Sequence, residues 1–144
     1  MFLSLLSLRK KFNPKFELAY LNLGVALSRQ GKIDAAIRSY NRALQIKPDL
    51  AVAYNNLGNA LLRQGKYQNA ISNYLQAIEI DPNYETAYNG IGAALIRLGD
   101  IGKALTFFKK ALFINPGYAD AKNNLNNTLS AVKKKKDEID AKSK

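Results

Sequence analysis

The amino-acid sequence predicts an all-α protein in which antiparallel helix pairs stack along the chain. The first observation behind this prediction is an internal repeat: residues 17–50, 51–84 and 85–118 align over 34 positions without an insertion. The second is that apolar residues within each repeat recur at helical spacing, between glycine and proline positions that end helices. A constant period of about 20 to 50 residues is typical of stacked repeat architectures.

Each repeat is predicted to form two helices. In the middle copy, Gly65 follows the first apolar stretch and is expected to end the first helix in a left-handed conformation. The second helix is expected to stop at Asp81, because Pro82 lacks an N–H and disfavours helix in the residue before it. Small residues at invariant positions predict close contact between the paired helices; they are Gly58, Ala70 and Ala77.

These residues resemble the tetratricopeptide repeat family. The family pattern W-x2-L-G-x2-Y, A-x3-F and P appears in the middle copy as Tyr54-x2-Leu57-Gly58-x2-Leu61, Ala70-x3-Tyr74 and Pro82. The resemblance covers residues 17–118 and implies a right-handed superhelical solenoid of antiparallel helix pairs with a C-terminal capping helix.

The two ends of the chain lie outside the three repeats. Residues 1–16 are expected to form an N-terminal partial repeat or capping helix, because residues 12–16 align with the proline-containing end of each repeat. The alternatives are an amphipathic membrane anchor in residues 1–12 and the truncated start of a longer array. Residues 119–144 are predicted to be a capping helix with one apolar stripe, followed by a charged tail that is either a helical extension or frayed.

Composition disfavours catalysis. The chain has no cysteine, which excludes cysteine nucleophiles and thiolate metal sites, and no histidine, the commonest general base and transition-metal ligand. We therefore expect no cofactor and no enzymatic activity. The net charge of +11 gathers mainly at the two ends, whereas a nucleic-acid reader more often carries a continuous basic stripe. We therefore expect the partner not to be a nucleic acid.

The resemblance implies a concave groove lined by the first helix of each repeat, and we expect a peptide segment of a partner to bind there. In the first two copies the candidate residues are Leu18, Leu21, Asn22, Val25, Arg29, Val52, Asn55, Asn56, Asn59, Leu62 and Arg63. Farther along the chain they are Asn89, Arg97, Asn123, Asn124 and Asn127. These sixteen positions are called the predicted peptide surface below.

Asparagine can donate to and accept from a peptide backbone, so a row of asparagines suits an extended ligand of any sequence. Asn22, Asn56 and Asn124 share a column that is similar to the asparagine ladder of O-linked N-acetylglucosamine transferases, although Gly90 interrupts it. Arg29, Arg63 and Arg97 would select acidic side chains of the bound peptide. The alternative for both residue types is an ordinary solvated helix surface, because cations are favoured at helix C-termini in any case.

Co-chaperones of this family hold the acidic tails of heat-shock chaperones with a two-carboxylate clamp of lysine, asparagine and arginine. The corresponding columns here hold Leu21, Val25, Asn56, Thr86 and Gly90, of which only Asn56 matches. We therefore expect the partner not to be such a tail.

These observations predict a non-enzymatic protein–protein interaction module that acts as a scaffold or adaptor. Its partner would be an extended protein segment or peptide with acidic and apolar residues, and its location cytoplasmic. One alternative is an assembly factor at a membrane surface, with peripheral membrane contact through residues 1–12. The other is the repeat region of a larger transferase-type protein.

Overall fold

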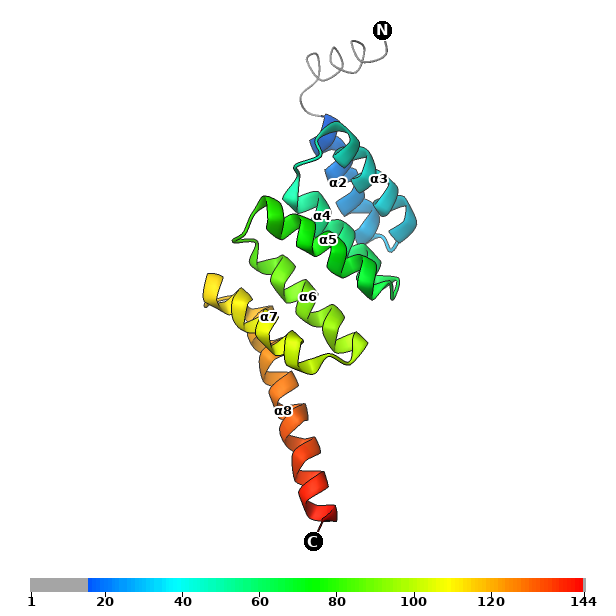
Figure 1. Ribbon diagram of the computed structural model, residues 1–144. Coiled ribbons are helices and arrows are strands. Elements are labelled where there is room, and N and C mark those ends of the chain that lie inside the picture. Colours follow the sequence, from blue (N-terminus) through cyan, green and yellow to red (C-terminus); the bar gives the residue numbers. More distant parts are fainter. Residues whose placement is uncertain (1–15, 144) are drawn as a thin grey trace. The chain divides into compact units, whose positions relative to one another are not determined.

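A computed structural model describes residues 16–143 and contains seven α-helices and no strand within that range, so the all-α prediction is confirmed (Figure 1). The helices are α2 (Phe16–Arg29), α3 (Ile33–Ile46), α4 (Ala51–Arg63), α5 (Tyr67–Ile80), α6 (Glu85–Leu98), α7 (Ile101–Ile114) and α8 (Ala119–Lys142). The predicted N-terminal cap and the alternative membrane anchor lie outside the described residues, except that residue 16 begins α2.

The chain divides into two compact units. The first unit ends at Pro82 and contains α2 to α5, and the second begins at Asn83 and contains α6 to α8. Within each unit, consecutive helices pair: α2 packs on α3, α4 on α5, and α6 on α7. In the first unit α3 also packs on α4, so the two helix pairs of this unit are in contact.

The turn inside each pair is the glycine turn that the sequence predicts. Gly65 adopts φ +75°, and its N–H donates to the carbonyl oxygen of Leu62 at 3.0 Å, while the N–H of Lys66 donates to that of Leu61 at 2.9 Å. This pair of bonds is the Schellman motif, which satisfies carbonyl groups left open at a helix C-terminus. Gly31 and Gly99 take the same left-handed conformation in the other two turns.

Close contact between paired helices explains the second glycine column. A Cβ atom added to Gly58 would lie 2.5 Å from Cε1 of the Tyr74 ring, which is fully buried. The same relation holds between Gly24 and Tyr40, and between Gly92 and Phe108. A large aromatic residue of the second helix therefore occupies the space that a side chain on the first helix would need.

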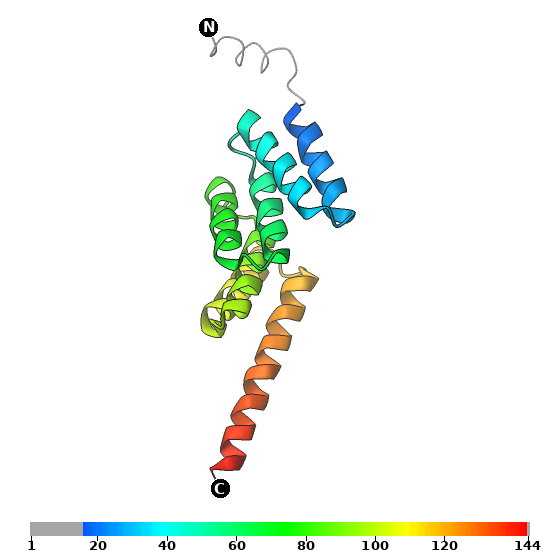
Figure 2. The same cartoon turned by 90° about the vertical axis from the view of Figure 1, so that its right-hand side faces the viewer.

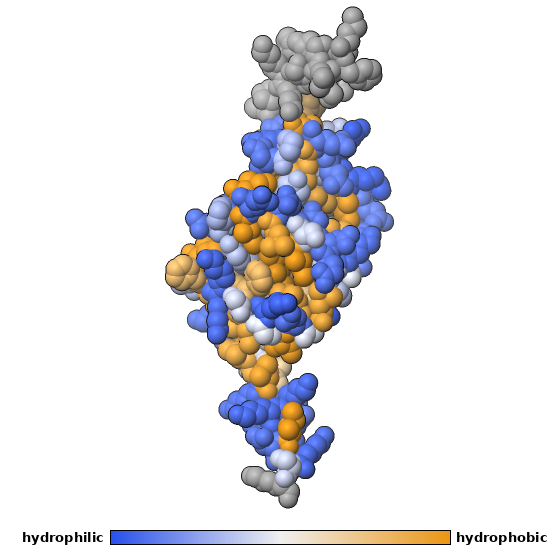
Figure 3. All heavy atoms as spheres, viewed as in Figure 1, coloured by the Kyte–Doolittle hydropathy of each residue, from blue (hydrophilic) through white to orange (hydrophobic). Residues whose placement is uncertain are grey.

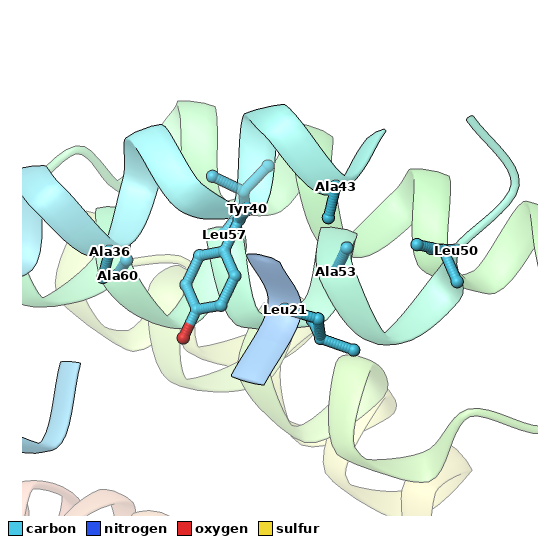
Figure 4. Packing of buried hydrophobic residues seen from close by; sticks show 8 residues of the cluster. All are labelled: Leu21, Ala36, Tyr40, Ala43, Leu50, Ala53, Leu57 and Ala60. Carbon is cyan, nitrogen blue, oxygen red and sulfur yellow. The ribbon is translucent and has the colours of Figure 1, made fainter. Parts of the chain in front are cut away.

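One buried cluster of the first unit is built from small and large side chains of α2, α3 and α4, together with Leu50, which precedes α4 (Figure 4). Alanines allow the backbones to approach one another, and Tyr40 and Leu57 fill the space between them. The buried members of this cluster are Leu21, Ala36, Tyr40, Ala43, Leu50, Ala53, Leu57 and Ala60.

Helix α8 packs on α7 along its N-terminal part and then extends past α6 and α7 (Figure 2). Ala121 is buried and Leu125 is half-buried, whereas every described residue from Leu129 onward is exposed. The extending part of α8, at the bottom of the view in Figure 3, is largely hydrophilic. Of the two alternatives for the charged tail, the structure shows the helical extension, which reaches Lys142. No helix within residues 16–143 combines the length and the apolar character needed to cross a membrane.

Candidate peptide-binding surfaces

In the first unit, the predicted peptide surface divides into exposed residues and core residues. Leu18, Asn22 and Arg29 of α2 are exposed, and so are Asn59 and Arg63 of α4. These side chains lie on the first helix of each pair, where an incoming ligand can reach them. Two further members on α4 are half-buried, namely Asn56 and Leu62.

The prediction needs correction at two positions. Leu21 is only 7% exposed, because it packs into the core cluster that α2, α3 and α4 form (Figure 4). Asn55 is only 6% exposed. Val25 and Val52 are half-buried and pack against the same core cluster, so they offer little free area to a ligand. A helix in a repeat array has neighbours on several sides, and the repeat period alone did not separate the core-facing positions from the free ones.

Arg63 links the two helix pairs of the first unit. Its Nη1 atom donates to the backbone carbonyl oxygen of Ser28 at 2.9 Å and contacts the Ser28 hydroxyl oxygen at 3.2 Å. Ser28 lies in the last turn of α2, and its carbonyl oxygen also accepts from the Gly31 N–H at 3.0 Å, so Arg63 is the second donor to this oxygen. Arg63 is therefore a C-terminal cap for the preceding first helix, and only its remaining guanidinium N–H groups are open to a ligand.

Asn59 also has a structural partner. Its side-chain oxygen accepts a hydrogen bond from the Tyr74 hydroxyl at 2.7 Å. This bond satisfies the polar end of a tyrosine whose ring fills the space above Gly58. The Asn59 side chain is exposed, and its amide nitrogen is left as a donor for a ligand.

In the second unit, two of the predicted asparagines bind each other. Nδ2 of Asn124 on α8 donates to Oδ1 of Asn89 on α6 at 2.9 Å. Burial, helped by the nearby charge of Asp120, raises the pKa of the Tyr118 hydroxyl, and a side-chain hydrogen bond with Asn89 opposes this rise. These bonds hold α8 against α6. The remaining members, Arg97, Asn123 and Asn127, are exposed.

Several polar contacts between elements were not anticipated. Ser28 accepts the bonds from Arg63, and Tyr74 donates the bond to Asn59. In addition, Nε2 of Gln64 donates to Oδ1 of Asp34 within the first unit. Ser28 directly precedes the invariant arginine column, but the sequence offers no sign that its carbonyl group would be capped from the next repeat. Within residues 16–143, no group of three or more acidic side chains is placed to hold a metal ion.

Comparison with known families places the repeats in one class. A family model described as TPR repeat matches residues 29–65 and 58–99. A second model, described as tetratricopeptide repeat, matches residues 85–118, which is the third copy of the internal repeat. No curated protein matches the chain.

Solved structures with the same fold include three TPR domains of RPAP3 proteins, each 27% identical to this chain. The first TPR of Spaghetti (RPAP3), bound to the HSP90 peptide SRMEEVD, has a TM-score of 0.77 and covers 82% of this chain and 94% of its own. The first TPR domain of human RPAP3 has a TM-score of 0.80, with 86% and 98% covered. The second human RPAP3 domain, in complex with the HSP70 peptide SGPTIEEVD, has a TM-score of 0.73, with 78% and 94% covered.

Proposed function

Since this chain belongs to the tetratricopeptide repeat family, we propose that it is a non-catalytic module that binds an extended peptide segment of a partner protein and acts as an adaptor. The observation that supports this proposal best is a set of exposed polar and apolar side chains on the first helices of the first unit. Leu18 and Asn22 are exposed members of this set, and Leu62 is half-buried. The solved relatives bound to peptides agree with this kind of partner.

The binding mode combines a rigid protein surface with a partner that becomes ordered on binding. Helix pairs locked by Schellman turns and buried aromatics give a preformed surface, so most of the ordering cost falls on the peptide. Asn22 and Asn56 would bind the peptide backbone, and Leu18 and Leu62 would accept an apolar side chain. Arg29 would favour a peptide that carries an acidic residue next to this apolar side chain.

The peptide would not be held by the two-carboxylate clamp. Leu21 and Val25 stand where the clamp needs a lysine and an asparagine, and Leu21 belongs to the core. If the tail peptide SRMEEVD binds at all, the affinity should be the same when its C-terminal carboxylate is amidated. A much tighter complex with the free carboxylate would show that the clamp operates in this chain.

The function can be tested by selecting peptides from a random library on the full chain and measuring their affinity by fluorescence anisotropy. Leu62→Ala should weaken binding by about 0.5–2 kcal/mol without salt sensitivity, because it removes apolar contact area. Arg29→Ala should weaken it by a similar amount only at low salt, because exposed charges are screened.

Matched controls lie at the start of α5, where Gln68 and Asn69 are exposed but belong to a second helix. Alanine at either position should leave the affinity unchanged. If these two variants lose binding while Leu62→Ala and Arg29→Ala bind like the wild type, the working surface is on the second helices and the proposal is wrong.

A further inference from the structure

The charges of the first unit are separated between its two ends. At the end where each first helix turns into its second helix lie four cations, Arg29, Lys32, Arg63 and Lys66, with one acid, Asp34. At the opposite end lie four acids and one cation: Glu17, Asp49, Glu79, Asp81 and Lys47. The four cations are called the turn edge below. All four are exposed.

The charges at the two ends of the first unit interact only weakly with one another. A helix of 14 residues, such as α2, is about 20 Å long, whereas charges are screened over about 8 Å at physiological ionic strength. The acids at the far end therefore do little to neutralise the turn edge. Two arginines remain in the middle of α3, Arg38 and Arg42, and they belong to neither end.

The turn edge comes from two identical tetrapeptides, Arg-Gln-Gly-Lys, at residues 29–32 and 63–66. Side-chain bonds fix one turn beside the other. Arg63 donates to Ser28, directly before Arg29, and Gln64 donates to Asp34, two residues after Lys32. The cations are thus held on a preformed edge, and the one acid among them is already engaged by Gln64.

The side chains of the two turn-edge lysines do not cap the helices that they precede. Lys32 and Lys66 occupy the N-cap positions of α3 and α5, and neither side chain makes a capping hydrogen bond. A cation beside a helix N-terminus is unfavourable, because the helix dipole is positive there. In the third repeat the same position is Asp100, whose carboxylate accepts from the Lys103 N–H at 3.2 Å. Folding alone would favour an acid at all three positions.

We infer that the turn edge is a binding surface for an acidic protein segment, one rich in aspartate and glutamate. Arginine guanidinium groups suit carboxylates through paired hydrogen bonds, and lysines add charge that draws such a segment to the edge. Nucleic-acid bases would stack on exposed aromatic rings, but the two tetrapeptides contain none, and Tyr67, which directly follows the second one, is half-buried. This surface is distinct from the apolar and asparagine positions of the proposed function and shares only the two arginines with them.

The test measures the anisotropy of a fluorescein-labelled oligoglutamate with the full chain at low and high salt. The wild type should bind at low salt and release the probe at high salt. Lys32→Asp/Lys66→Asp should lower the affinity by about tenfold or more, because two attractive charges become repulsive. The same double variant should melt at a higher temperature than the wild type, since it supplies the missing caps, so unfolding cannot explain a loss.

The control variant, Arg38→Glu/Lys47→Glu, changes the net charge by the same amount away from the turn edge. It should keep most of the affinity. If both double variants lose binding equally, the probe senses only net charge and the inference fails. Tighter binding of an oligothymidylate of equal charge, with the same dependence on Lys32 and Lys66, would overturn it in favour of a phosphate ligand. Association of the chain with itself at low salt, seen by light scattering and abolished by Lys32→Asp/Lys66→Asp, would show that the edge pairs with the acidic end of a second copy instead.

Retention of oligoglutamate binding in Leu62→Ala would separate this surface from the proposed peptide surface. A chain that binds oligoglutamate but selects no library peptide would contradict the proposed function alone. The reverse result would contradict the turn edge alone.

Discussion

At the scale of single residues, the invariant glycines are required for two different reasons, a left-handed backbone conformation or the absence of a side chain. Gly65 is needed for its left-handed backbone, since no neighbouring atom except the Tyr67 side chain comes within 4 Å of its Cβ position. Gly58 is needed for its missing side chain, because the Tyr74 ring occupies that space. Gly102 has neither reason: it is exposed in α7 and has nothing within 4 Å of its Cβ position.

This difference predicts opposite effects of substitution. Gly58→Leu should lower the free energy of unfolding by about 1–3 kcal/mol, because the new side chain must displace Tyr74 in a packed core. Gly102→Ala should cause no loss and gain up to about 1 kcal/mol, since alanine is the better helix former. Urea unfolding followed by circular dichroism measures both. Equal effects of the two substitutions would mean that α4 and α5 do not pair as described.

Asp100 is the residue at which the chain should show a pH-dependent stability. Hydrogen bonds from the Lys103 side chain and backbone hold the pKa of its carboxyl below the ordinary 3.8. A carboxyl with a lowered pKa in the folded state stabilises folding above its unfolded pKa, and the contribution is lost as the pH falls through the folded value.

We therefore expect Asp100→Ala to lower the melting temperature at neutral pH, with a difference from the wild type that shrinks as the solution is acidified below about pH 4. Asp100→Asn, which keeps a capping oxygen, should lose less at neutral pH. A wild-type advantage that stays constant into strong acid would show that the charge of Asp100 contributes nothing.

Among the elements, α8 combines two regions with different roles. Its N-terminal part caps the second unit: Ala121 is fully buried, and Asn124 is bonded to Asn89 on α6. Its C-terminal part leaves the unit, and Leu129, Val132 and Ile139 are 44%, 41% and 58% exposed. Only the first part can contribute packing energy to the repeat that precedes it.

Two alanines on α8 test this division. Ala121→Leu should destabilise the protein by about 1–3 kcal/mol through overpacking. Ala131→Leu, on the exposed part of the same helix, should change the stability by no more than about 0.5 kcal/mol. Thermal unfolding monitored at the helix band compares them directly. A loss at Ala131 as large as that at Ala121 would show that the extended part of α8 is packed in solution.

At the scale of the whole molecule, the repeats share their packing logic but differ in surface chemistry. All three copies have the same glycine turn and the same glycine–aromatic contact. The turns of the first two copies each carry an arginine and a lysine. The third turn keeps the arginine, Arg97, but has Asp100 in the lysine column, and Asp100 forms an ion pair with Lys103 at 3.0 Å. Repetition therefore explains the fold, and the departures from it mark where partners are expected to differ.

The sequence by itself determined the fold class, the helix ends and the close pairing at Gly58, because each depends on local backbone preference or on a period repeated three times. Only the tertiary structure decided which of the predicted surface residues are buried or hydrogen-bonded within the fold. Leu21 and Asn55 became buried, Arg63 became a cap for α2, and Asn89 paired with Asn124. The repeat period gives a helix face but not the neighbour that covers it, since burial and hydrogen-bond partners arise between residues that lie about one repeat apart in the chain.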